Sequence, residues 1–253
     1  MDLQCYVLIM KRFILILLFI FVLVSLSAQE IDTVRLTPSS YTGFILPTLF
    51  ITYGSVAKHQ KILRQIDIKV HEEVIERQRK KYTIDNYIQY TPVIAVYGLD
   101  FMGVKAKHNV MDRAFITVSS YMLSFATVQI LKNNTNIMRP DDTNPHSFPS
   151  GHTATAFTGA HLLFKEYKDT SIWIGIAGYT IAGCTGAMRI YNKKHWFSDV
   201  VAGMGIGIMS VEISYLLLPL YDKLSGKTDA QRKIFVAPSI HTDNYGVGIA
   251  YSF

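Results

Sequence analysis

The sequence predicts an all-α protein, a bundle of about six helices, with a short C-terminal β-hairpin. Apolar stretches of helical length recur along the chain, small residues gather in the last of them, and the tail alternates with a period of two. At 49% hydrophobic and 17% charged residues, the chain is apolar for a soluble protein and polar for a fully embedded one. Its 253 residues suit one domain with appendages.

The N-terminus resembles a secretory signal, which we predict to occupy residues 1–28. Lys11-Arg12 forms a short basic region, an apolar run covers 13–24, and small residues occupy 25–28. The apolar run is shorter than the roughly 20 residues of a membrane-spanning helix, which favours cleavage. The alternative is an uncleaved anchor helix.

The helical domain is expected over residues 29–224. A helix is predicted at 42–57, interrupted by Pro47 and Gly54. Residues 60–81 carry an apolar stripe at every fourth position and could lie on a bilayer or pack on other helices. Further apolar stretches follow at 84–103, 112–131, 153–167, 171–188 and 196–221.

The last helix and the tail carry distinct signals. Gly203, Gly205 and Gly207 predict close packing between helices. In the tail, 225–253, strands are expected at 233–240 and 245–253. One hairpin cannot make a barrel, so we expect it to pack on the bundle or at the membrane interface. A similarity to the last strand of outer-membrane barrels is the second interpretation.

Charge and cysteine content exclude several classes of partner and site. The net charge of +6 suits anionic membranes or phosphate substrates, but the basic residues of 58–81 alternate with glutamates and no nucleic-acid motif appears. A solvated helix face is therefore expected there. The two cysteines give no disulfide framework, and no metal-ligand spacing, cofactor or protein partner is indicated.

Three clusters between residues 132 and 199 carry the chemistry. Lys132 is followed after six residues by Arg139-Pro140, then comes the run 149–152 (Pro-Ser-Gly-His), and then Arg189-x5-His195-x3-Asp199. Fixed cations stabilise the charge that grows on phosphate oxygens in a transition state. The ordered set therefore suits phosphoryl transfer.

This set resembles the type 2 phosphatidic acid phosphatase family, which shares its helical core with bacterial acid phosphatases and vanadium haloperoxidases. The family pattern is Lys-x6-Arg-Pro, Pro-Ser-Gly-His and Ser-Arg-x5-His-x3-Asp. Every charged or ionisable position is filled, and only Met188 departs, standing where Ser is usual. That departure puts one phosphate hydrogen bond in doubt.

Within this resemblance, His195 is expected to be the nucleophile, with Asp199 one helical turn later taking its imidazole N–H. His152 is expected to be the general acid. A phosphate-binding set is expected of Lys132, Arg139, Ser150, Gly151 and Arg189. Ser150 could also simply cap the following helix.

The resemblance implies a membrane-associated phosphatase without metal or cofactor, acting on a lipid phosphate monoester or pyrophosphate. Lipid A, undecaprenyl pyrophosphate and phosphatidyl phosphates are the candidate substrates. The signal indicates a bacterial cell-envelope location with the site facing the periplasm. Three alternatives stay open: a soluble periplasmic acid phosphatase, a vanadium-dependent haloperoxidase, and a structural envelope protein with a decayed site.

Overall fold

A computed structural model of the chain describes residues 39–77, 80–225, 233–241 and 244–252. The predicted signal peptide, 1–28, lies outside this part of the chain. The helices are α2 (Ser39–Ala57), α3 (Lys61–Arg77), α4 (Asp85–Ile88), α5 (Thr91–Phe101), α6 (Val110–Thr135), α7 (Gly151–Tyr167), α8 (Ile172–Tyr191) and α9 (Phe197–Leu224). The strands are β1 (Lys233–His241) and β2 (Asn244–Ser252).

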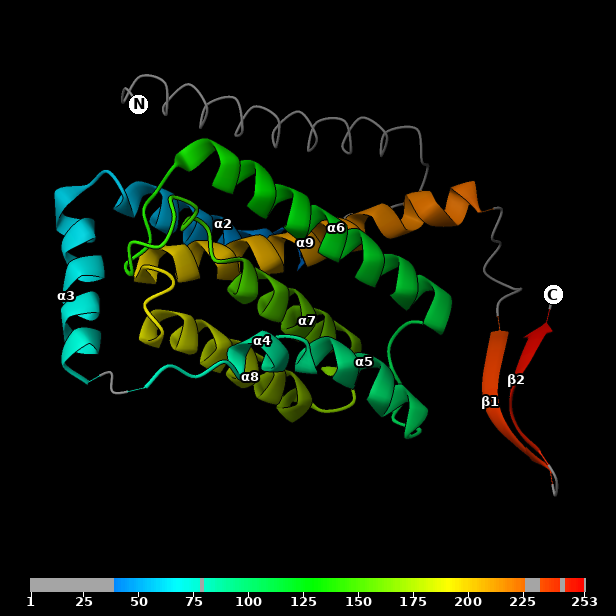
Figure 1. Cartoon of the computed structure of the whole chain (residues 1–253). Coiled ribbons are helices and arrows are strands. Elements are labelled where there is room, and N and C mark those ends of the chain that lie inside the picture. The colour runs from blue at the N-terminus through cyan, green and yellow to red at the C-terminus, as the bar shows by residue number, and fades with distance from the viewer. Residues whose placement is uncertain (1–38, 78–79, 226–232, 242–243, 253) are drawn as a thin grey trace.

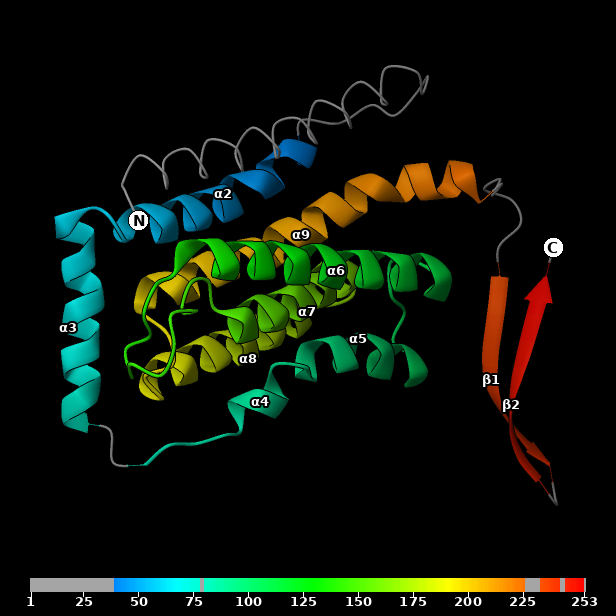
Figure 2. The same cartoon turned by 45° about the horizontal axis from the view of Figure 1, so that its top comes forward.

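Helix α7 is the centre of the bundle. It packs against α5, α6, α8 and α9, while α2 lies along the outer side of α9. Helix α3 runs across one end of the bundle, roughly perpendicular to the long helices (Figures 1 and 2). The chain reverses between successive long helices, so that α6 and α8 end where α7 and α9 begin, at the end that α3 crosses (Figure 1).

The packed body is all-α, but the predicted fold class is wrong in the number of helices and in making the hairpin part of that fold. Eight helices form it where about six were expected, and within residues 39–77 and 80–225 it contains no strand. The stretch predicted as 84–103 divides into α4 and α5, since Pro92, in the first turn of α5, has no N–H with which to continue the preceding helix.

The tail forms a separate two-stranded ribbon. Strands β1 and β2 pair antiparallel, with Lys233 opposite Ser252 and His241 opposite Asn244. They form a sheet of two strands, and no strand–helix pair is among the closely packed elements of the described chain. A lone ribbon of this kind adds no hydrophobic core, so the expected packing of a hairpin on the bundle is not found.

Glycines let α9 approach two neighbouring helices, as the sequence predicted. A Cβ atom on Gly203 would lie 2.6 Å from the Ser150 carbonyl oxygen, and one on Gly207 would lie 2.6 Å from that of Ala154. On the opposite side, a Cβ on Gly205 would lie 2.6 Å from the Pro47 carbonyl oxygen. Close packing of α9 is therefore confirmed, and it brings the first turn of α9 against the start of α7.

Apolar side chains are exposed around the bundle on α2, α5, α6 and α8. The largest on α6 are Met122 and Phe125, 67% and 68% exposed, and Trp173 on α8 is 72% exposed. Helices α6 and α9 are long and apolar enough to cross a membrane, and α6 is mostly exposed. Large exposed apolar surfaces mark membrane or protein contacts. Together with the length of α6, these surfaces indicate association with a membrane.

Replacing Gly203 with alanine is expected to destabilise the bundle by about 1 to 3 kcal/mol, because the new methyl group overlaps backbone. Gly183→Ala on α8 is the matched control, since a Cβ there meets nothing within 4 Å. It should be neutral or stabilise by up to about 1 kcal/mol through helix propensity. Unfolding in detergent measures both. Equal stability of the two variants would contradict the packing described for α9.

Candidate active site

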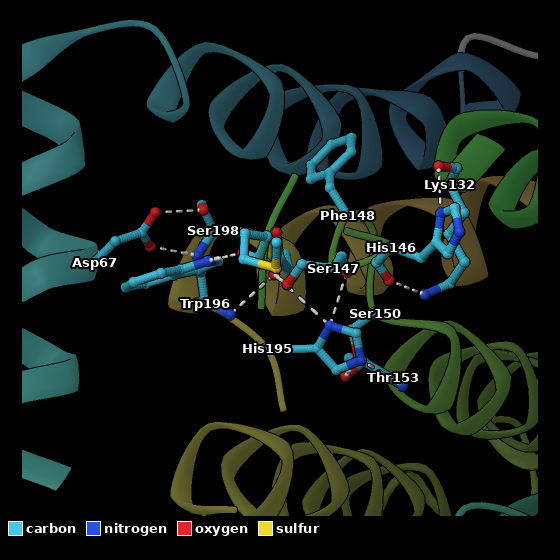
Figure 3. A network of polar contacts seen from close by, with 12 residues as sticks. Asp67, Lys132, His146, Ser147, Phe148, Ser150, Thr153, His195, Trp196 and Ser198 are labelled. Atoms are coloured by element: carbon cyan, nitrogen blue, oxygen red, sulfur yellow. Dashed lines mark hydrogen bonds and ion pairs between the residues drawn. The ribbon is translucent and has the colours of Figure 1, made fainter. Parts of the chain in front are cut away.

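The three sequence clusters meet at the end of the bundle where the helix ends gather. Lys132 lies in the last turn of α6, His152 in the first turn of α7, Arg189 in the last turn of α8 and Asp199 in the first turn of α9. His195 lies in the loop just before α9. Figure 3 shows His195 pointing toward the loop that carries Ser147.

His195 is held in one tautomer by a backbone carbonyl. Its side chain is 2% exposed, and Nδ1 lies 2.7 Å from the Ser147 carbonyl oxygen. A carbonyl oxygen only accepts, so Nδ1 carries the proton and donates it. Nε2 of the neutral ring then has a free lone pair. The geometry leaves a nucleophilic nitrogen opposite the tethered one.

The Asp199 carboxylate is held by three polar contacts. Oδ2 accepts hydrogen bonds from the Ser147 hydroxyl at 2.5 Å and from the Trp196 backbone N–H at 2.9 Å. Oδ1 lies 2.6 Å from Lys58 Nζ. The distance from Oδ2 to His195 Nδ1 is 3.6 Å. The direct acceptor of the imidazole N–H is therefore the Ser147 carbonyl rather than Asp199, which instead fixes the loop and places a negative charge beside the ring.

His152 approaches the same end from α7. Its Nε2 lies 2.8 Å from the side-chain amide oxygen of Asn86 on α4. Burial lowers the pKa of His152 to about 4, with a further lowering by Arg189, opposition from Asp85, and smaller lowering by Lys132 and Arg139. A ring so surrounded by cations takes up a proton readily only when an anion arrives to offset them.

Arg189 is fixed by a buried carboxylate. Its Nη1 lies 2.6 Å from Asp85 Oδ2, and the two side chains are 9% and 1% exposed. Asn192 extends the contact, donating to the Tyr82 carbonyl at 2.7 Å. Arg189 Nε is buried without a hydrogen-bond partner among the described residues. An orphaned guanidinium donor at this position can bond an oxyanion.

Lys132 and Arg139 complete a cationic cluster. Lys132 Nζ donates to the His146 carbonyl at 2.9 Å. Burial and then the charge of Arg189 lower the pKa of Arg139, and its Nε is also buried without a partner in the described chain. Like charges crowd together at a cost unless an anion compensates them. The cluster is thus arranged to receive a multiply charged anion such as phosphate.

The side chain of Ser150 has a structural place. It is fully buried, its hydroxyl lies 2.8 Å from Thr153 Oγ1, and it caps α7. Its backbone N–H donates to the Asp199 carbonyl at 3.0 Å. The capping interpretation therefore describes Ser150 better than a direct phosphate contact. The N–H groups of Gly151 and His152 follow at the helix start, where backbone donors face outward.

Five residues near the site are not singled out by the sequence. Lys58 is expected on a solvated helix face, yet its side chain is 3% exposed and contacts Asp199. A lysine that follows an apolar helix is the only signal for it in the sequence. The others are reached through contacts more than 45 residues apart, which sequence spacing does not reveal: Asp67, Asp85, Asn86 and Ser147.

Trp196 and Asp141 hold the loop before α7. Trp196 Nε1 donates to the Met138 carbonyl at 2.8 Å, and Arg64 of α3 lies over its ring. Asp141 pairs with Lys194 at 2.7 Å. Trp196 is therefore held between α3 and this loop.

In the described part of the chain, no group of three or more His, Cys, Asp or Glu side chains could hold a metal ion.

Residues 113–223 match the sequence profile of the PAP2 superfamily. They contain all three clusters. This part of the chain resembles a PAP2 superfamily domain. The geometry above is that of the residues that match this profile, supported by α2, α3 and α4, which lie before the matched region.

Curated relatives cover part of the chain. A lipid A 1-phosphatase of Porphyromonas gingivalis is 38% identical over 138 residues, 54% of this chain and 31% of the relative. An undecaprenyl-diphosphatase of Sulfolobus acidocaldarius is 34% identical over 101 residues, 38% of this chain and 47% of the relative. The chain thus spans less than half the length of these relatives.

Two solved structures are similar at lower identity. The crystal structure of Aquifex aeolicus LpxE has a TM-score of 0.41 at 23% identity, covering 66% of this chain and 93% of its own. A PAP2-type phosphatidylglycerolphosphate phosphatase from Bacillus subtilis has a TM-score of 0.44 at 20% identity, covering 76% and 100%.

The titration of His195 makes folding stability depend on pH. Burial lowers its pKa from 6.5 to about 4, Asp199 opposing and Lys132 and Arg189 adding to the decrease. Between these values the unfolded chain binds a proton that the folded chain does not, so stability is lost as pH falls from 6.5 to about 4.

When the pH is lowered from 6.5 to 4.5, the free energy of unfolding of the wild type should fall by about 2 kcal/mol more than that of His195→Gln. Parallel pH curves for the two proteins would contradict the buried neutral imidazole.

Proposed function

We propose that the chain is a phosphatase that hydrolyses a phosphate monoester or pyrophosphate of a lipid through a phosphohistidine on His195. The observation that carries this proposal is the Nδ1 contact of His195 with the Ser147 carbonyl, 2.7 Å. It leaves the Nε2 lone pair as the nucleophile at the cationic cluster.

The reaction proceeds in two balanced steps. In the first, Nε2 of His195 forms a bond to phosphorus, the bond from phosphorus to the leaving oxygen breaks, and that oxygen takes a proton from His152. In the second, His152 takes a proton from water, the resulting hydroxide attacks phosphorus, and the N–P bond breaks to release phosphate and neutral His195.

The cations act on the charge that the reaction moves. Lys132, Arg139 and Arg189 hold the phosphoryl oxygens, and Arg189 and Arg139 each offer a buried Nε without another partner in the described structure. A bound phosphate dianion offsets these charges beside His152 and raises the pKa of its ring toward neutral pH. Substrate binding thereby favours the protonated form of His152 that a general acid needs.

A lipid substrate follows from where the site lies. The cluster occupies the end of α6, a helix that is long enough to cross a membrane and that exposes several large apolar side chains. A phosphorylated headgroup would meet the cations while its acyl chains remain against the bundle. The names of the curated relatives, lipid A 1-phosphatase and undecaprenyl-diphosphatase, supply the first two candidate substrates.

The proposed location is the bacterial cell envelope with the site on the periplasmic side. The basic and apolar run at residues 11–24 supports export of the helical domain. Both α6 and α9 have one end at the site, so the whole site lies at one face of the membrane.

Phosphate release by purified protein tests this function. The panel contains lipid A, undecaprenyl pyrophosphate, phosphatidylglycerol phosphate and p-nitrophenyl phosphate. We expect one lipid to be the preferred substrate, His195→Ala to abolish release, and His152→Ala to lower turnover by about 10²- to 10⁴-fold. The control for loss of a histidine is His108→Ala, which should stay active. His108 lies on the loop between α5 and α6, and its ring pairs with Glu166 of α7.

The alternatives give different results in the same assay. Release from the small ester alone indicates a soluble-type acid phosphatase. No release, with halide oxidation once vanadate and hydrogen peroxide are added, indicates a haloperoxidase. Full activity of His195→Ala would refute the nucleophile.

A further inference from the structure

Lys58 is a buried lysine that lies outside the PAP2 match. It follows α2, and its Nζ lies 2.6 Å from Asp199 Oδ1 and 3.7 Å from Asp67 Oδ2, with side chains 3%, 0% and 0% exposed. The ammonium group also lies 5.6 Å from the centre of the Phe148 ring. Lysines are almost never fully buried unless paired, so this position has a specific charge to balance.

Asp67 joins α3 to the first turn of α9. Its Oδ1 accepts from the Ser198 backbone N–H at 2.8 Å and its Oδ2 from the Ser198 hydroxyl at 2.6 Å. Arg64 lies 3.5 Å away on the side toward solvent. Figure 3 shows Asp67 reaching from α3 to Ser198 beside Trp196. Asp67 thus fixes both Lys58 and the helix that carries Asp199.

We propose that Lys58 and Asp67 are positioning residues that hold the Asp199 carboxylate ionised and away from the imidazole N–H, so that His195 stays neutral and nucleophilic. The inference rests on the proposed phosphohistidine chemistry. The charges alternate along a buried line, from Asp67 to Lys58 to Asp199 to the His195 ring. Each member therefore sets how strongly the next one attracts a proton.

The geometry explains why such a counterion is required. A bare carboxylate 3.6 Å from Nδ1 would favour imidazolium, which has no lone pair for phosphorus. Lys58 binds the far oxygen, Oδ1, and draws the carboxylate charge away from the ring. Ser147 and Trp196 occupy the near oxygen, Oδ2, with hydrogen bonds.

The order of charges along this line determines whether removing one of them makes the His195–Asp199 pair easier or harder to protonate. The other charges facing His195 are Lys132 from α6, Arg189 from α8 and Asp199 from α9. Removing the Lys58 cation makes the His195–Asp199 pair easier to protonate. Removing the Asp67 charge leaves Lys58 less neutralised and makes the pair harder to protonate. A purely structural role would not produce opposite signs.

The test is a histidine NMR titration of the full chain in detergent micelles, with His195 assigned from its absence in His195→Gln. We expect Lys58→Met to raise the apparent pKa of the His195–Asp199 pair by about 1 or more and Asp67→Asn to lower it. Lys58→Arg should stay close to wild type. Lys61→Met, which removes a charge from an exposed position on α3, is the matched control and should leave the titration unchanged.

The acid limb of the pH–rate profile provides a second readout. It should move to higher pH in Lys58→Met and lower in Asp67→Asn, with kcat affected more than KM. An unchanged titration in Lys58→Met, or shifts of the same sign in both variants, would overturn the inference. If Lys58→Met does not fold, Asp67→Asn decides: a lowered apparent pKa supports the charge line, and an unchanged one refutes it.

The two proposals fail separately in this design. A wild-type protein with no phosphatase activity refutes the proposed function, while the titration, which needs no turnover, still decides whether Lys58 and Asp67 control the histidine.

Discussion

The structure depends on one buried carboxylate. Asp199 has 0% exposure and contacts the link after α2 through Lys58, the loop before α7 through the Ser147 hydroxyl, and the start of its own helix through the Trp196 N–H. Its backbone carbonyl also accepts from the Ser150 N–H, which ties α9 to α7. A buried charge left without these partners would cost several kcal/mol. Four segments must therefore meet correctly before the site exists, and the same contacts that stabilise Asp199 orient His195.

Helix ends explain how the bundle brings distant residues together. Each long helix reverses direction relative to the last, so two C-terminal ends and two N-terminal ends share one face, with α3 lying across it (Figure 2). Close approach at Gly203 keeps α9 against the Ser150 carbonyl. Because α6 exposes apolar side chains along its length, the same arrangement places a cationic site at the edge of an apolar surface. Under the proposed function, recognition of a charged headgroup and contact with its lipid come from one architecture.

The sequence predicts the motif residues because the chemistry needs fixed residue types at short spacings. The expected helical turn from His195 to Asp199 is not found, since His195 lies in the loop before α9. The sequence also predicts the role of Gly203 and Gly207, since small residues repeated along a helix have few other purposes. It does not predict that Asp85 pairs with Arg189, which is 104 residues away, or that Lys58 is buried. In the sequence, Asp85 and Lys58 look like ordinary polar positions on amphipathic segments. The acceptor for His195 is a main-chain carbonyl, which no side-chain pattern encodes. The tail alternates convincingly, yet its ribbon adds nothing to the packed body.

The covalent intermediate is the most direct test of the account. Purified protein would be mixed with substrate carrying labelled phosphate, quenched with base within milliseconds, digested after Lys194, and analysed by mass spectrometry. The account predicts an acid-labile, base-stable phosphoryl group on the peptide that begins at His195, absent in His195→Ala and accumulating in His152→Ala, where water is no longer activated. Label on another residue, or turnover with no labelled peptide at any quench time, would contradict it.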